Sequence, residues 1–143
     1  MRIFVLAALC FAALATPAAA DARTWKGKTK QGRAVTVKTG ADDLVNRVRV
    51  GWRAPCEKGH YVSRTLFLPP LDVAEDAAFE DAGTYESKVP GGYKARHTVF
   101  VRGALDEDRW TGTFRVRTRV IRDGKEVDRC KLERVRWTAE PVE

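Results

Sequence analysis

Hydrophobic and polar residues alternate along most of the chain beyond residue 20. The alternation is clearest from Arg109 to Arg122, where arginines occupy one face and the other face consists of Phe114, Val116, Thr118 and Val120. A period of two residues is typical of a strand that has one face in the core and one in water. The same period from Leu44 to Arg53 predicts a second such strand, with an inner face of Leu44, Asn46, Val48, Val50 and Trp52.

The remaining β-rich segments are shorter and are separated by turns. They predict strands at Trp25–Lys30, Arg33–Thr39, Tyr61–Leu68, Gly83–Lys88, Tyr93–Leu105, Lys125–Cys130 and Arg134–Ala139. The pair Asp123-Gly124 is typical of a two-residue hairpin turn. The stretch Leu71–Ala82 is acidic and alanine-rich, and we expect it to form one short helical turn or an ordered loop pinned by Phe79.

Several short strands without a sustained helical period indicate an all-β fold. Because hairpins dominate the connections, the sheets should be antiparallel. We therefore predict a single antiparallel β-sandwich, with a closed β-barrel as the alternative. The expected core is Trp52, Phe67, Phe100, Phe114, Val116, Val120 and Trp137.

Residues 1–20 have the layout of a secretory signal peptide. Arg2 precedes an apolar run from Ile3 to Ala15, and small residues follow before Asp21. The run is shorter than the roughly 20 residues that span a bilayer. We therefore expect one secreted domain, residues 21–143, with no transmembrane segment and a periplasmic or extracellular location.

Removal of the leader would remove Cys10 and leave Cys56 and Cys130. Two cysteines in a small exported domain are usually paired, and only one intramolecular pairing exists here. We predict a Cys56–Cys130 disulfide; two free, buried thiols are the alternative.

The chain is basic, with 26 Lys and Arg against 19 Asp and Glu. Arg2 is the only charged residue of the predicted leader, so the excess of positive charge belongs to the secreted domain. A basic surface favours anionic partners. For an exported protein these would be acidic polysaccharide, lipopolysaccharide or another anionic component of the cell envelope.

Arginines form a row on one face of the clearest strand. Arg115, Arg117 and Arg119 alternate, which places successive side chains about 6.5–7 Å apart on an extended strand. Arg134 and Arg136 would add a second row if the last strand lies nearby. Guanidinium groups bind phosphate, sulfate and carboxylate in two-pronged geometry, so the rows predict an anion-binding surface. The alternative is an ordinary solvated face of a sheet.

The hairpin at Asp123-Gly124 partly favours that alternative. If these are the central turn residues, Arg122 faces Lys125, Ile121 faces Glu126, and Arg119 faces Asp128, so cross-strand pairs would neutralise part of the charge. The same register places Cys130 opposite Arg117, on the polar face. Either a bulge near Arg129 shifts the phase or the disulfide lies at the edge of the sheet.

Residues for catalysis are sparse. Ser63 and Ser87 are the only serines, and neither lies in a G-x-S-x-G motif. Cys56 and His60 have a zinc-like spacing, but no second pair completes a tetrahedral site, and we expect His97 to be a packed or surface residue. The acidic residues between 72 and 81 lack EF-hand spacing, and so small a domain offers little cleft for a sugar. We predict no catalytic activity, no metal site and no cofactor.

Much of the chain resembles a loose group of exported bacterial β-domains of unknown function. The matching residues are Trp110-x-Gly112-x-Phe114-x-Val116, Gly124, Cys130 and Val135-Arg136-Trp137-Thr138-Ala139, together with Trp25-x-Gly27-x-Thr29-x-Gln31-Gly32 and Cys56. These are scaffold and disulfide positions, so the resemblance implies a fold and no activity.

A shorter segment, Gly83-Thr84-Tyr85-Glu86-Ser87, is similar to a hairpin of the avidin family of biotin-binding barrels. The similarity implies ligand contacts at Tyr85 and Ser87. The opening G-x-W strand of that family is absent, because the order here is Trp25-x-Gly27, and its later tryptophan and aspartate positions have no match.

We therefore expect an exported, non-enzymatic binding or structural domain, which contacts anionic envelope polymers through its arginine row. The alternatives are a β-barrel carrier of a small ligand and an enzyme inhibitor. An inhibitor of a basic lysozyme would be expected to be acidic, whereas this chain is basic.

Overall fold

The computed structural model describes residues 22–68, 71–74 and 77–143, without the side chains of 72–74. The predicted leader, its Cys10 and the expected new N-terminus at Asp21 lie outside the described residues. In the described part of the chain, no helix is long and apolar enough to cross a membrane.

Within these described residues, nine strands form one sheet, and every pairing between them is antiparallel. Their order is β4-β3-β2-β1-β9-β8-β7-β6-β5. The strands are β1 (Thr24–Thr29), β2 (Ala34–Thr39), β3 (Val45–Cys56), β4 (Gly59–Phe67), β5 (Asp72–Ala74), β6 (Ala78–Val89), β7 (Tyr93–Asp106), β8 (Arg109–Arg122) and β9 (Lys125–Pro141). The all-β, antiparallel prediction is confirmed.

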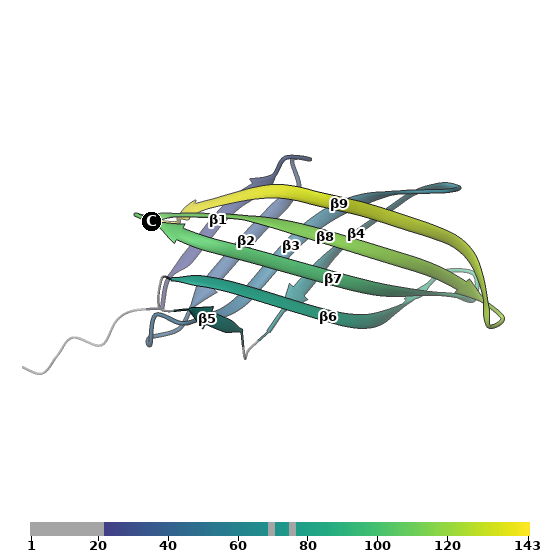
Figure 1. Cartoon of the computed structure of the whole chain (residues 1–143), viewed down its shortest axis with the longest axis horizontal. Helices are drawn as coiled ribbons and strands as arrows, with labels where there is room; N and C mark the ends of the chain where they lie inside the picture. The colour runs from purple at the N-terminus through teal and green to yellow at the C-terminus, as the bar shows by residue number, and fades with distance from the viewer. Residues whose placement is uncertain (1–21, 69–70, 75–76) are drawn as a thin grey trace, which may run out of the picture.

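The sheet folds over so that its two halves face each other, with β1–β4 crossing behind β6–β9 (Figure 1). The ring centroids of Trp52 in β3 and Phe114 in β8 lie 6.3 Å apart, and that of Phe67 in β4 lies 6.4 Å from Phe114. In the described chain the end strands β4 and β5 each have one strand partner, so the sheet is open. The predicted sandwich is therefore confirmed, as two layers of one continuous sheet.

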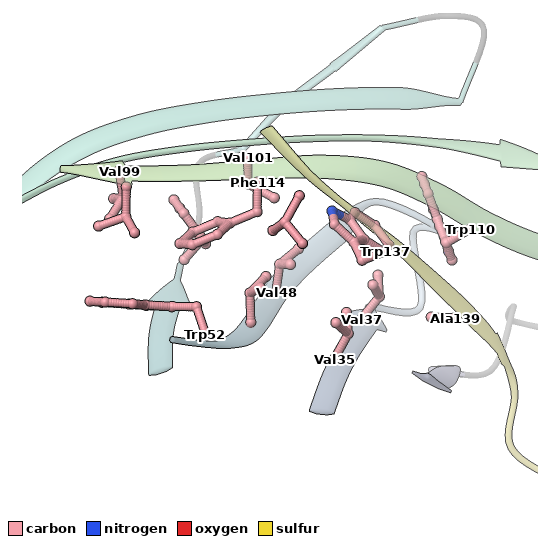
Figure 2. Close-up of a cluster of buried hydrophobic side chains, with 14 of the residues drawn as sticks. Val35, Val37, Val48, Trp52, Val99, Val101, Trp110, Phe114, Trp137 and Ala139 are labelled. Carbon is pink, nitrogen blue, oxygen red and sulfur yellow. The ribbon is translucent and has the colours of Figure 1, made fainter. Parts of the chain in front are cut away.

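Buried side chains from both halves form one core (Figure 2). Val120 is partly buried against it, and five other predicted core residues are fully inside: Trp52, Phe67, Phe114, Val116 and Trp137. The prediction for Phe100 is wrong. It alternates with buried Val99 and Val101, so it lies on the outer face, where the Arg115 guanidinium carbon is 4.6 Å from its ring centroid.

A pair of glycines lets Trp137 pack against the inner face of the sheet. Gly103 in β7 pairs with Gly112 in β8, and Trp137 in β9 lies opposite Gly112. A Cβ atom at position 112 would lie 2.1 Å from the Arg102 carbonyl oxygen and 2.5 Å from the Trp137 ring. The indole therefore occupies space that any other residue at 112 would need.

The start of β3 departs from the predicted phase. Val45 is buried, whereas Leu44 and Asn46 are exposed, so these two do not share the inner face of Val48 and its successors. A register shift between Lys38 and Thr39 in the neighbouring β2 accompanies the change. Such an irregularity moves side chains to the opposite face without changing the alternation beyond it.

The acidic stretch between 71 and 82 also differs from prediction. The described parts contain a short strand, β5, paired with the start of β6, and no helical turn. Phe79 is buried, as expected of an anchoring residue. Residues 75–76 of this stretch lie outside the described residues. At the other end of the chain, the two strands expected between 125 and 139 are one continuous strand, β9.

The Cys56–Cys130 disulfide is present, and the bulge alternative explains its position. Ile121 faces Glu126 as predicted, but a register shift after Val120 puts Arg119 opposite Arg129 rather than Asp128. Cys130 consequently lies opposite buried Thr118 and not Arg117, and its sulfur faces the core. Its partner Cys56 forms the only backbone bridge described between β3 and β9.

Candidate functional site

A groove of about 1190 Å³ lies on the outer face of β7, β8 and β9, between the start of β6 and the end of β1. Five basic side chains line it, whereas Glu80 is the only acidic residue among those described along its walls. The basic residues are Lys30, Arg102, Arg115, Arg134 and Arg136. An excess of fixed positive charge in a concave surface raises the local concentration of anions.

Strand register brings these charges together from four separate segments. Thr113 in β8 pairs with Arg102 in β7 on one side and with Arg136 in β9 on the other. We call such a row of residues paired across neighbouring strands a rung, and this first rung is basic. Lys30 joins the end of this rung, because its backbone N–H donates to the Arg136 carbonyl oxygen at 2.8 Å. The groove is therefore a product of pairing between strands that are distant in sequence.

A bulge in β9 supplies the second rung. Phe114 pairs with Val135 and Val116 pairs with Leu132, so two residues of β9, Glu133 and Arg134, oppose the single residue Arg115. The extra residue keeps both Val135 and Leu132 turned toward the core while Arg134 remains exposed. Arg115 also lies over the ring of Phe100, which orients its guanidinium on the outer face.

Three of the five predicted anion-binding arginines line this groove: Arg115, Arg134 and Arg136. Arg117 and Arg119 line a smaller hollow of about 470 Å³ further along β8. In the described chain, none of these forms an ion pair except Arg119. The predicted row is thus continuous along β8, but among the described residues its arginines are unpaired at the groove end and ion-paired at the Arg119 end.

Glu126 neutralises the end of the row. Its carboxylate accepts from Arg119 Nε at 2.5 Å and from Arg129 Nε at 2.8 Å. These two contacts, that with Arg119 first, hold the pKa of Glu126 below its usual value. The neutralisation of Arg119 that the hairpin register predicted is present, although the acidic partner is Glu126 and not Asp128.

The middle of the row is only partly compensated. Lys131 pairs with Glu133, and this hydrogen bond is the main reason that the pKa of Glu133 is low. The positive charges of Arg117 and Arg115 lower that pKa further. One exposed carboxylate therefore interacts with three cations, and positive charge remains in excess.

Two groove residues were not among the predicted binding residues, Lys30 and Arg102. Arg102 alternates with inward-facing residues of its strand, so the sequence pattern indicated that its side chain lies on the outer face. Lys30 follows the last residue of β1, and no local pattern connects it with β9. Only the pairing of β1 with β9 places it at the groove.

Hydroxyl groups meet in the interior, at the end of the sandwich away from Trp137. Ser87 Oγ lies 2.9 Å from His97 Nε2, and His97 Nδ1 lies 2.9 Å from Thr118 Oγ1. Tyr61 Oη contacts Ser87 at 3.3 Å, and a neighbouring chain runs from Trp52 Nε1 through Thr65 to Tyr85. Burial lowers the pKa of His97, which favours its neutral form.

This interior cluster contains Tyr85 and Ser87, the residues that the avidin-like segment implied as ligand contacts. Their hydroxyls bond to other residues of the protein, which satisfies buried polar groups that would otherwise be costly. The sequence left open whether His97 is packed or on the surface, and in the structure it is fully buried. The sulfurs of Cys56 and Cys130 lie close to Asp128, but they are bonded to each other and are not thiolate ligands.

Comparison with protein-family models, with curated proteins and with solved structures gives no match for this chain. Functional inference therefore rests on geometry and charge.

Proposed function

We propose that the protein is an exported, non-enzymatic binding domain that captures an anionic polymer of the cell envelope in its cationic groove. The observation that carries the proposal is the set of five basic side chains, drawn from four segments, around a groove with one acidic residue in its described lining. An acidic polysaccharide or the sugar-phosphate part of lipopolysaccharide has repeated anionic groups that suit such a surface.

The arrangement of the two rungs supports a polymer over a single small anion. Arg102 and Arg136 lie on one rung, and Arg115 and Arg134 on the next, two residues further along β8. Alternate residues on a strand are about 6.5–7 Å apart, so the two rungs offer separate positions for successive anionic groups. A chain with regularly spaced negative groups can contact both at once.

Charge reversal in the groove provides the test. We expect Arg115→Glu with Arg136→Glu to weaken low-salt binding of a soluble acidic polysaccharide strongly, measured by titration calorimetry. The matched control is Lys88→Glu with Lys125→Glu, which changes the net charge equally at exposed positions near the hairpin ends, outside the groove. Equal weakening by both variants would show that overall charge, and not the groove, causes binding, and would reject the proposal.

A further inference from the structure

A second surface, formed by the outer faces of β3 and β4, combines apolar and basic side chains. Four of the five large hydrophobic side chains that are exposed in the described chain belong to this region: Leu44, Val62, Leu66 and Leu68, each 42–53% exposed. Leu44 precedes β3 and Leu68 follows β4, so both lie at the same end of this antiparallel strand pair.

The side-chain pattern of β4 is unusual for a strand whose outer face is exposed to water. Its inner side chains include buried Thr65 and Phe67, and its outer side chains include Val62 and Leu66. Large apolar side chains gathered on an exposed face are typical of a surface that binds a partner. In addition, β4 ends the sheet order and has β3 as its only strand partner in the described chain.

Arginines surround these apolar residues. Leu66 pairs with Arg49 and Val62 pairs with Arg53, which places a positive charge beside each hydrophobic side chain. Arg47 and Arg64 extend the basic surface, and neither β3 nor β4 contains an acidic residue. In the described part of the chain, none of the four arginines forms an ion pair.

We propose that this face, defined by Val62, Leu66, Leu68, Leu44 and the arginines 47, 49, 53 and 64, docks on the surface of an anionic lipid bilayer. Apolar side chains that insert at the headgroup boundary, ringed by cations that meet lipid phosphates, are the combination that binds such surfaces. A second copy of this chain fits less well, because it would bring two sets of unpaired arginines together.

The face is separate from the cationic groove. β3 and β4 pack through their inner residues against β8, as the Trp52–Phe114 and Phe67–Phe114 contacts show, so their outer face points away from that of β7–β9. The inference therefore does not depend on the groove binding a polymer. If both are correct, the domain holds a membrane on one side and an anionic polymer on the other.

Vesicle sedimentation tests the inference on the native, oxidised protein. We expect binding to vesicles of phosphatidylcholine with phosphatidylglycerol, weak binding to phosphatidylcholine alone, and a fraction of binding that survives raised salt because of apolar insertion. Val62→Ser with Leu66→Ser should weaken partitioning about tenfold and remove the salt-resistant fraction. Arg49→Glu with Arg53→Glu should remove the preference for anionic vesicles.

Two controls separate this face from other surfaces. Val142→Ser changes the fifth exposed hydrophobic residue and should leave partitioning unchanged. Arg115→Glu with Arg136→Glu alters the groove and should leave the salt-resistant fraction intact. The inference is overturned if Val62→Ser with Leu66→Ser, shown to be folded by its tryptophan emission, binds vesicles as the parent does. It is equally overturned if the parent does not bind anionic vesicles, or if it forms a dimer in solution that the same variant dissociates.

Discussion

Loss of the Cys56–Cys130 disulfide should destabilise the fold strongly, and the size of the effect follows from its position. The bond joins residues separated by 74 positions and lies at the only backbone bridge described between β3 and β9. The chain-entropy model for a loop of this length gives about 4.5 kcal/mol, and removal of native disulfides from small secreted domains typically costs about 2–5 kcal/mol.

This loss converts into a large change in thermal stability. For a domain of about 100 to 150 residues, each 1 kcal/mol corresponds to roughly 3–5 °C in Tm, so a loss of about 2–5 kcal/mol should lower Tm by roughly 6–25 °C. Because natural domains are stable by only about 5–15 kcal/mol, the variant should also unfold at a much lower urea concentration.

Two variants separate the crosslink from local packing. Cys56→Ala removes the bond but keeps the buried Cys130 side chain, which is 1% exposed, whereas Cys56→Ala with Cys130→Ala also leaves a small cavity. Urea titration followed by tryptophan fluorescence should place most of the loss in the first variant. A loss below about 1 kcal/mol for Cys56→Ala would contradict the reasoning, since it would mean that the sheet fixes β3 against β9 without the bond.

Three further predictions follow from particular contacts. Gly112→Ala should cost about 2–4 kcal/mol in urea titration, because its Cβ overlaps the Trp137 ring and a backbone oxygen; unchanged stability would show that the strand adjusts. Burial lowers the pKa of His97, so as the pH falls the unfolded chain binds a proton at this residue before the folded chain does. The free energy of unfolding should therefore be largest above the ordinary pKa of 6.5 and decrease as the pH drops below it. His97→Gln should remove this decrease, and an unchanged decrease would show that another group causes it. Glu126→Gln removes the ion pair of Arg119, which lies outside the groove, so the protein should bind an acidic polysaccharide as the parent does; clearly stronger binding in calorimetry would show that the polymer reaches beyond the groove to Arg119.

The sequence was sufficient for most of the fold because strand alternation is a local property. The pattern from Arg109 to Arg122 predicted both ends of β8 and the placement of Phe114 and Val116 in the core. Phe100 shows the complementary lesson. Its hydrophobicity suggested the core, but it alternates with the inward-facing residues Val99 and Val101 and therefore lies on the outer face.

Bulges and pairing between distant strands account for the features that the sequence did not predict. The register shift after Val120 changed the partner of Arg119 and turned Cys130 toward the core, and a hairpin counted residue by residue from its turn does not contain that shift. Lys30 reaches the groove only because β1 pairs with β9. The candidate site was therefore predictable in its arginine row, and incomplete where it depended on which distant strands meet.

The salt dependence of polymer binding tests the central claim most directly. We predict that the logarithm of the affinity for a soluble acidic polysaccharide falls linearly with the logarithm of salt concentration, and that Arg115→Glu with Arg136→Glu makes the slope shallower by roughly 1–2, as expected when two counterion-releasing contacts are lost. The Lys88→Glu, Lys125→Glu control should keep the parent slope. Identical slopes for the parent and the groove variant would contradict the account.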